Sequence, residues 1–193
     1  CTPGFVMSLF TAWSNKSGLM AEEIDDTLAG NLCRCTGYRP IVEAGLSLRN
    51  IKQPQWELDR NEILKQELLK IKSAESIEIT DGKNSFSVPT NCEHFSETYA
   101  DRPETTIVSG ATDVGLWVTK QNRNLPNMIW TGRVEEFNQI VYDKEFIIIR
   151  PAITHQDAME RLGDKWPTIR ALWRRFGSVQ VRNSGTVCGN LAN

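Results

Sequence analysis

The chain of 193 residues has an ordinary globular composition, with 40% apolar and 24% charged residues, and is long enough for one large domain or two modest ones. Its net charge of -2 comes from 22 basic and 24 acidic residues spread along the sequence, which argues against nucleic acid or an anionic membrane as a partner. No apolar run approaches the roughly 18 residues that span a bilayer, and no charged and then apolar leader precedes the first domain. We therefore expect a cytoplasmic location.

The two ends of the chain and its cysteines indicate whether the sequence is complete and whether its thiols form disulfides. The first residue is Cys1 rather than a methionine, and Asn193 directly follows a turn-rich run, so we expect a fragment. Five cysteines are an odd number, and Cys33 and Cys35 are one residue apart, which fits a secreted disulfide framework poorly. Reduced cytosolic thiols, some of them metal ligands, fit better.

The first 50 residues are expected to form a compact cluster of helices around a loop. Pro3 and Gly4 stand where a helix would begin, and apolar residues follow at helical spacing. The run AEEIDDTLAG has its acids early and Gly30 at its end, which favours a second, short helix. After the cysteine loop, Pro40 opens IVEAGLSLRN, which predicts a third helix with one apolar face.

The composition then changes twice. Residues 51–79 are highly charged and lack aromatic residues after Trp56, which predicts a linker carrying one surface helix. From 80 to 193, β-rich runs such as TTIVSG and FIIIRPAI alternate with helical runs such as HQDAMERLG. A capping box of Thr90 and Glu93 is expected to start the first of those helices. The predicted fold class is therefore α+β in two domains, a small all-α domain followed by an α+β domain.

Three cysteines, Cys1, Cys33 and Cys35, fall within the helical domain in the pattern C-x31-C-x-C. Structural zinc sites favour cysteines two to four residues apart, so the one-residue gap is awkward for zinc. An iron-sulfur cluster takes four cysteines as terminal ligands, and the neighbouring Gly37 and Pro40 favour the tight turn that would aim two sulfurs at it. On the residues alone, zinc and a disulfide remain open as alternatives.

The segments CTPGFVMS at 1–8 and GNLCRCTGYRPIVEAG at 30–45 closely resemble the second [2Fe-2S] domain of the xanthine dehydrogenase family of molybdenum hydroxylases. That family pattern is C-G-x-C-T-P-G followed by C-R-C-T-G-Y. The resemblance implies that Cys1, Cys33 and Cys35 are metal ligands of the cluster, and that the first ligand lies before the start of this chain. Arg34, between two of the ligands, would tune the charge of the cluster or pair with a partner surface.

The run IVSGATDVGLWV, residues 107–118, predicts a short strand, a glycine turn and a helix. Backbone amides at such a turn can hold a phosphate. The run lacks both the Lys-Ser/Thr of a P-loop and G-x-G-x-x-G, so alone it fits a plain turn equally well. The run FGSVQVRNSGTVCGN, residues 176–190, resembles the second flavin-contacting segment of the same family, and both segments occur in the family's order. The domain therefore resembles the first part of the family's FAD-binding domain.

This resemblance implies a set of cofactor-binding residues in the two segments. The first segment would wrap the pyrophosphate and ribitol of FAD, and an aromatic residue and a second loop would complete the site. The implied residues are Ile107, Val108, Ser109, Gly110, Ala111, Thr112, Asp113, Val114, Phe176, Thr186, Gly189 and Asn190.

Two residues of these segments need a separate interpretation. Asp113 would face a diphosphate, so its carboxylate is expected to cap the following helix instead. Cys188 stands where the family has a glycine, and we expect a backbone there that suits glycine, so that the cysteine weakens FAD binding. The alternative is an unstrained backbone with the thiol packed as a small apolar residue.

Three further residues receive ordinary roles. His94 and His155 stand alone on helical runs and are expected to be surface or capping residues. Cys92 is expected to be a small, half-buried residue rather than a ligand.

The resemblance implies electron transfer within a molybdenum hydroxylase. Substrate would be oxidised at a molybdopterin centre on a large partner subunit, and electrons would pass through the [2Fe-2S] cluster to FAD and then to an acceptor such as NAD. No catalytic acid, base or nucleophile is expected in this chain. The domain order resembles that of the small subunit of bacterial xanthine dehydrogenases, which implies a hetero-oligomer and a role in purine catabolism.

Two alternatives remain at this point. The corresponding subunit of an aldehyde, carbon monoxide or N-heterocycle dehydrogenase would share every motif described above. The alternative of another class is a zinc-stabilised interaction module, which predicts a colourless protein.

Overall fold

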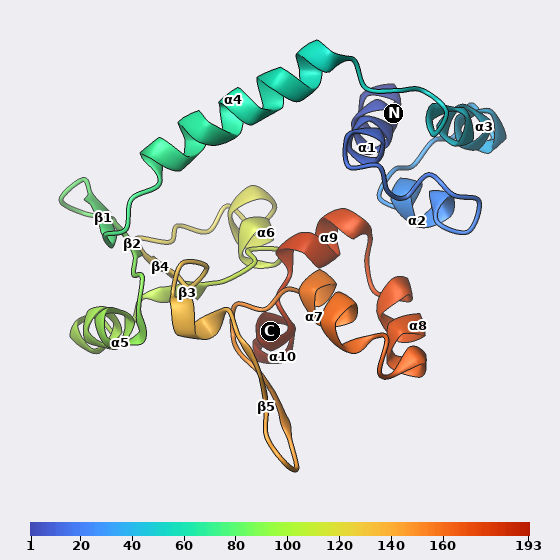
Figure 1. Ribbon diagram of the computed structural model, residues 1–193. Coiled ribbons are helices and arrows are strands. Elements are labelled where there is room, and N and C mark those ends of the chain that lie inside the picture. Colours follow the sequence, from blue (N-terminus) through green and yellow to red (C-terminus); the bar gives the residue numbers. More distant parts are fainter. The chain divides into compact units, whose positions relative to one another are not determined.

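The computed structural model describes all residues from 1 to 193, which form two compact units (Figure 1). The first unit comprises residues 1–72 together with the short segment 177–179, and the second comprises residues 73–176 and 180–193. The first is helical and the second combines helices with two small sheets. The α+β class predicted from the sequence is confirmed.

Four helices make up most of the first unit. They are α1 (Thr2–Ser14), α2 (Ile24–Leu28), α3 (Arg39–Leu48) and α4 (Gln55–Ile71). Pro3 lies in the first turn of α1 and Pro40 in the first turn of α3, where a helix needs no N–H donor. The helices expected within the first 50 residues are therefore present.

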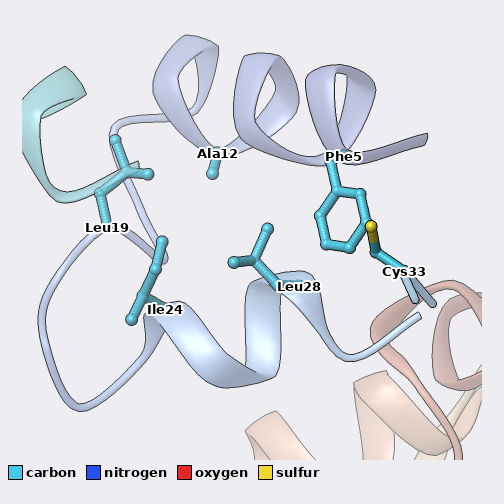
Figure 2. Close-up of a cluster of buried hydrophobic side chains, with 6 residues drawn as sticks. All are labelled: Phe5, Ala12, Leu19, Ile24, Leu28 and Cys33. Carbon is cyan, nitrogen blue, oxygen red and sulfur yellow. The ribbon is translucent and has the colours of Figure 1, made fainter. Parts of the chain in front are cut away.

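A small hydrophobic core holds the first unit together (Figure 2). Its buried members are Phe5, Ala12, Leu19, Ile24, Leu28 and Cys33. At Gly45 of α3, a Cβ would lie 2.7 Å from Cδ1 of Ile24 and 2.8 Å from Cδ2 of Leu9, so a larger residue would force these two side chains to shift. Figure 2 also shows the side chain of Cys33 beside the ring of Phe5, which anchors the cysteine loop to the core.

Helix α4 is the surface helix predicted for the linker. It begins after Pro54, which has an extended backbone, and most of its apolar side chains are exposed, among them Trp56 and Ile63. None of the helices combines the length and the apolar character that crossing a membrane would require.

The second unit is built from short strands and helices. Its strands are β1 (Ile77–Thr80), β2 (Ser85–Val88), β3 (Thr106–Val108), β4 (Asn127–Trp130), β5 (Ile140–Tyr142) and β6 (Ile147–Ile149). Its helices are α5 (Cys92–Asp101), α6 (Val114–Thr119), the 3-10 helix η1 (Glu135–Phe137), α7 (His155–Leu162), α8 (Pro167–Arg175), α9 (Val179–Ser184) and α10 (Val187–Ala192).

The main sheet places the candidate site at one of its edges. Its strand order is β1-β2-β4-β3, with β1 antiparallel to β2 and with β2, β4 and β3 parallel. Val108 pairs with Trp130, so β3 and β4 end side by side. Because parallel strands share their carboxyl edge, the loops that follow β3 and β4 start together, as is typical of ligand sites in such sheets.

The capping box expected from Thr90 and Glu93 is wrong. The N-cap of α5 is Asn91, whose Oδ1 accepts a hydrogen bond from the N–H of His94 at 2.9 Å. Thr90 has another partner, since its N–H donates to Oγ of Ser76 at 3.1 Å and the two hydroxyl oxygens lie 3.2 Å apart. A tertiary contact therefore displaces the local capping pattern by one residue.

Candidate functional site

The cysteine loop between α2 and α3 brings two thiols together. The sulfurs of Cys33 and Cys35 lie 3.4 Å apart, and the hydroxyl of Thr36 donates to Sγ of Cys33 at 3.2 Å. This hydroxyl and the backbone N–H groups of Cys35 and Thr36 lower the pKa of the Cys33 thiol to about 6. The adjacent Cys33 sulfur, through its hydrogen bond and then its negative charge, raises the pKa of Cys35. One thiolate is therefore already stabilised before any metal binds.

A strained turn holds this loop in place. Tyr38 has a φ of 65°, a conformation that costs a non-glycine residue about 1–3 kcal/mol. Its hydroxyl reaches back and accepts a hydrogen bond from the N–H of Cys33 at 2.9 Å, and its ring meets that of Phe5 edge-on at 6.1 Å. These contacts compensate for the strain and close the loop around the two thiols.

Cys1, the third predicted ligand, is not brought to this pair. It is exposed and stands at the N-cap of α1 without a side-chain capping bond, and no three His, Cys, Asp or Glu side chains gather as a metal site. Since nothing in the protein fixes its thiol, its role as a ligand stays a prediction.

The geometry of Cys33 and Cys35 nevertheless fits metal ligation. Two thiolates on one tetrahedral ion, each bound at about 2.3 Å, are about 3.8 Å apart, close to the 3.4 Å found here. Thiolates bind soft metals and iron-sulfur clusters, and donors such as the Thr36 hydroxyl offset their negative charge. The pair therefore suits half of a four-cysteine ligand set.

A cavity of about 330 Å³ lies in the second unit, next to the loop that follows β3. It is lined by most of the predicted cofactor-binding residues, from both segments. Those on its wall are Ile107, Ser109, Gly110, Ala111, Thr112, Asp113, Val114, Phe176, Thr186, Gly189 and Asn190. Val108 is buried within β3 and does not line the cavity.

The close approach of the two segments depends on Gly110. The hydroxyl of Ser184 donates to the carbonyl oxygen of Gly110 at 2.6 Å across 74 positions of sequence. A Cβ at Gly110 would lie 2.0 Å from the carbonyl oxygen of Ser184 and 2.8 Å from Cα of Gly185. Backbone atoms cannot move aside as a flexible side chain can, so any larger residue would push the segments apart.

The turn after Gly110 has unpaired backbone donors in residues that line the cavity. Ala111 has a φ of 58°, the left-handed conformation that usually belongs to glycine. The N–H groups of Ala111, Thr112 and Asp113 donate to no acceptor in the chain, although the three residues line the cavity. Successive free N–H groups in a turn form an anion-binding concavity.

The expected capping role of Asp113 is wrong. Asp113 occupies the N-cap position of α6, but its φ of -96° and ψ of -47° are helical, and its side chain makes no capping hydrogen bond. A helical N-cap backbone directs the carboxylate away from the N–H groups of the first turn. The carboxylate is therefore exposed on the cavity wall, where it can accept hydrogen bonds from hydroxyl groups.

The expected strain at Cys188 is also wrong. The residue lies in the first turn of α10 and is not among the residues with a positive φ. Its half-buried thiol donates to the carbonyl oxygen of Ile149 at 3.5 Å, and burial raises the pKa of this thiol. The glycine-like conformation lies instead in the first segment, at Ala111.

His155 is the main residue of the cavity that the sequence interpretation missed. It is 6% exposed rather than a surface residue, and its ring centroid lies 4.2 Å from that of Phe176. Nε1 of Trp173 donates to its Nδ1 at 3.2 Å, and burial lowers the pKa of its imidazole. His94 is half-buried on α5, and Cys92 is half-buried as expected. Tertiary packing against Trp173 and Phe176 distinguishes His155 from His94.

The start of α7 is tied to the second segment. Thr154 and Asp157 form a capping box, which the pattern T-x-x-D could have indicated. Thr154 also forms a β-bridge with Thr186, and the N–H of His155 donates to the carbonyl oxygen of Gly185 at 2.9 Å. These contacts fix His155 and the second loop against one another.

Two families of known domains match the chain. The family described as "FAD binding domain in molybdopterin dehydrogenase" matches residues 80–193, and the family described as "[2Fe-2S] binding domain" matches residues 1–46. Each match contains one of the two sites described above.

Individual proteins are similar along almost the whole chain. Xanthine dehydrogenase/oxidase of Rattus norvegicus is 22% identical over 99% of this chain, and the probable aldehyde oxidase gad-3 of Caenorhabditis elegans is 25% identical over 98% of it. The chain covers only 18% of the length of each relative. The structure of quinoline 2-oxidoreductase from Pseudomonas putida 86 matches with a TM-score of 0.52 and 18% identity, over 59% of this chain and 41% of that chain, which is a likeness of fold.

Proposed function

The chain belongs to the molybdenum hydroxylase family and carries its [2Fe-2S]-binding and FAD-binding domains, and on this premise we propose that it is the electron-transfer subunit of a xanthine dehydrogenase-like enzyme. In this role the chain takes electrons from a molybdopterin centre on a partner subunit and delivers them to NAD in the cytoplasm. When bound, the cluster supplies one-electron transfer and FAD supplies hydride transfer.

The observation that carries this proposal is the junction of the two predicted FAD-contacting segments. Ser184 and Gly110 meet through a hydrogen bond of 2.6 Å although 74 positions separate them, and a cavity opens beside that bond. A plain strand-helix turn needs no such junction. The cavity volume of about 330 Å³ is at the lower end of the usual range for small-molecule sites, which suits one part of an extended dinucleotide.

The proposed roles of the cavity residues follow from their chemistry. The free N–H groups of Ala111 and Thr112 donate to the phosphates of FAD, and Gly110 provides the close approach that forms the turn. The carboxylate of Asp113 accepts hydrogen bonds from hydroxyl groups of the sugar or ribitol. The ring of Phe176 offers an aromatic surface on the cavity wall.

The proposed roles of the cysteine loop are ligation and charge compensation. Cys33 and Cys35 bind the cluster together with Cys1, and Thr36 donates to the Cys33 sulfur so that the thiolate form is favoured. Tyr38 keeps the loop closed through its bond to the N–H of Cys33.

The first experiment is the cofactor content of the intact protein. We expect two absorbing groups in the visible spectrum, with iron, acid-labile sulfide and FAD found on chemical analysis. A colourless protein with bound zinc would contradict the proposal and favour the zinc-stabilised interaction module, because zinc also accepts two thiolates at this separation.

The second experiment concerns the substrate. The relatives include both a xanthine dehydrogenase/oxidase and an aldehyde oxidase, so the alternative is the corresponding subunit of an aldehyde, carbon monoxide or N-heterocycle dehydrogenase. The complete enzyme should be bleached anaerobically by xanthine and recoloured by NAD+. Bleaching by an aldehyde, carbon monoxide or quinoline but not by xanthine would assign the chain to the alternative.

A further inference from the structure

His155 combines burial, an unpartnered ring nitrogen and a place among the residues that line the cavity. Four buried side-chain atoms of the chain have no hydrogen-bond partner: Ser14 Oγ, Glu57 Oε1, Thr105 Oγ1 and His155 Nε2. Only His155 among them belongs to the cavity wall. Buried polar groups are almost always paired, so this nitrogen calls for an explanation.

The hydrogen bond on the other side of the ring determines where the proton lies. The indole nitrogen of Trp173 can only donate, so Nδ1 of His155 must accept, at 3.2 Å. Burial lowers the pKa of the imidazole, which keeps the ring neutral with one proton. That proton is therefore on Nε2, which becomes a donor without an acceptor.

The ring is also held in position before any ligand binds. The backbone N–H of His155 is bonded to Gly185, and the ring packs on Phe176 with centroids 4.2 Å apart. Thr154 and Asp157 fix the helix turn on which His155 stands. A fixed donor loses little side-chain entropy when it meets a ligand.

We propose that His155 is a ligand-binding residue of this cavity, and that its Nε2–H donates a hydrogen bond to an acceptor oxygen of the bound flavin dinucleotide. This inference rests on the proposed function, since phosphate, ribitol and ring oxygens of FAD are the acceptors that it requires. Trp173 acts as a positioning residue, because its donated bond selects the tautomer that has the proton on Nε2.

Two substitutions separate the donor from the rest of the ring. In His155→Asn the amide oxygen can replace Nδ1 and accept from Trp173, but no donor reaches the place of Nε2. In His155→Gln the longer side chain can place its amide nitrogen near Nε2. We expect the Kd of the intact, flavin-free protein for FAD, measured by quenching of flavin fluorescence, to rise about tenfold in His155→Asn. In His155→Gln we expect a rise of about threefold or less.

The outcomes distinguish this inference from the proposed function. If the wild-type protein binds FAD and His155→Asn binds it with an unchanged Kd, the role of His155 is wrong and the proposed function stands. If the wild-type protein binds no FAD, both are wrong.

A measurement on the wild-type protein covers the case in which a variant fails to fold. With 15N-labelled histidine, we expect the protonated nitrogen of His155 to be Nε2, and its proton resonance to shift when FAD is added. Protonation of Nδ1 in the flavin-free protein, or a resonance that FAD leaves unchanged, would overturn the inference.

Discussion

The cysteine loop and the FAD cavity are built in opposite ways. In the cysteine loop, the bonds from Thr36 and to Tyr38 join residues three and five positions from Cys33. In the cavity, the decisive bond joins Ser184 to Gly110 across 74 positions. A site built from local contacts should respond to a change in one side chain, whereas a site built from distant loops should depend on the backbone atoms that let them meet.

The largest effect is expected at Gly110. Gly110→Ala places a Cβ against the backbone of Ser184, so we expect a loss of about 3 kcal/mol or more in the free energy of unfolding of the second unit. The Kd for FAD should rise at least about a hundredfold. Chemical denaturation and FAD titration measure both quantities.

Gly115→Ala provides the matched control. Apart from its chain neighbours and the backbone of its own helix α6, no atom lies within 4 Å of a Cβ at Gly115, so alanine should stabilise the helix by about 0.5–1 kcal/mol. If Gly110→Ala and Gly115→Ala had the same free energy of unfolding and the same Kd for FAD, the cavity would not depend on the junction of the two segments.

A smaller effect is expected in the core of the first unit. Gly45→Ala crowds Ile24 and Leu9, whose side chains can partly adjust, so we expect a loss of about 1–3 kcal/mol. Thermal unfolding should show the loss, and the FAD affinity should stay unchanged. Ser47→Ala, an exposed change on the same helix, should alter stability by less than about 0.5 kcal/mol. If Gly45→Ala also changed the free energy of unfolding by less than about 0.5 kcal/mol, α3 would be able to move away from the core.

Thr36 tests the local control of the cysteine loop. In the metal-free protein, the Cys33 thiol becomes reactive as the pH rises through its pKa of about 6. Thr36→Val removes the hydroxyl donor that stabilises the thiolate, so the midpoint of alkylation against pH should move upward by about one pH unit. Thr36→Ser keeps the hydroxyl and should keep the midpoint. An unchanged midpoint in Thr36→Val would assign the low pKa to the backbone donors alone.

The smallest effect is expected at Ala111. Ala111→Gly removes the Cβ from a residue with a φ of 58° and should raise the free energy of unfolding by about 0.5–1 kcal/mol. Ala171→Gly, in helix α8, should lower it by a similar amount, because a helical alanine gains nothing from the change. If both substitutions lowered the free energy of unfolding, the turn would not be strained at Ala111.

The same contrast explains what the sequence could predict. Pro3 and Pro40 marked the starts of two helices, and the spacing of Cys33 and Cys35 indicated a thiol pair, because each depends on neighbours within a few residues. The β-rich runs likewise appear as strands, because the preference of β-branched residues for strands is a local property.

The predictions that were wrong concern residues whose burial or backbone conformation is not determined by their immediate neighbours in the sequence. His155 has the local sequence of a helix start, and its burial depends on Trp173 and Phe176. For Cys188, Thr186 could have indicated the helical backbone, since its hydroxyl accepts from the N–H of Gly189 as an N-cap does. In the first segment, the sequence favours Gly110 as the residue with a positive φ, because glycine adopts this conformation most easily. The structure has the positive φ at the next residue, Ala111.

The most direct test of the account is a cross-comparison of two variants of the intact protein, Cys33→Ser and Gly110→Ala, by iron and FAD analysis. We predict that Cys33→Ser loses the iron of one [2Fe-2S] cluster and keeps its FAD, while Gly110→Ala loses FAD and keeps its iron. Loss of both cofactors in either variant, or loss of neither, would contradict two sites that are built and held independently.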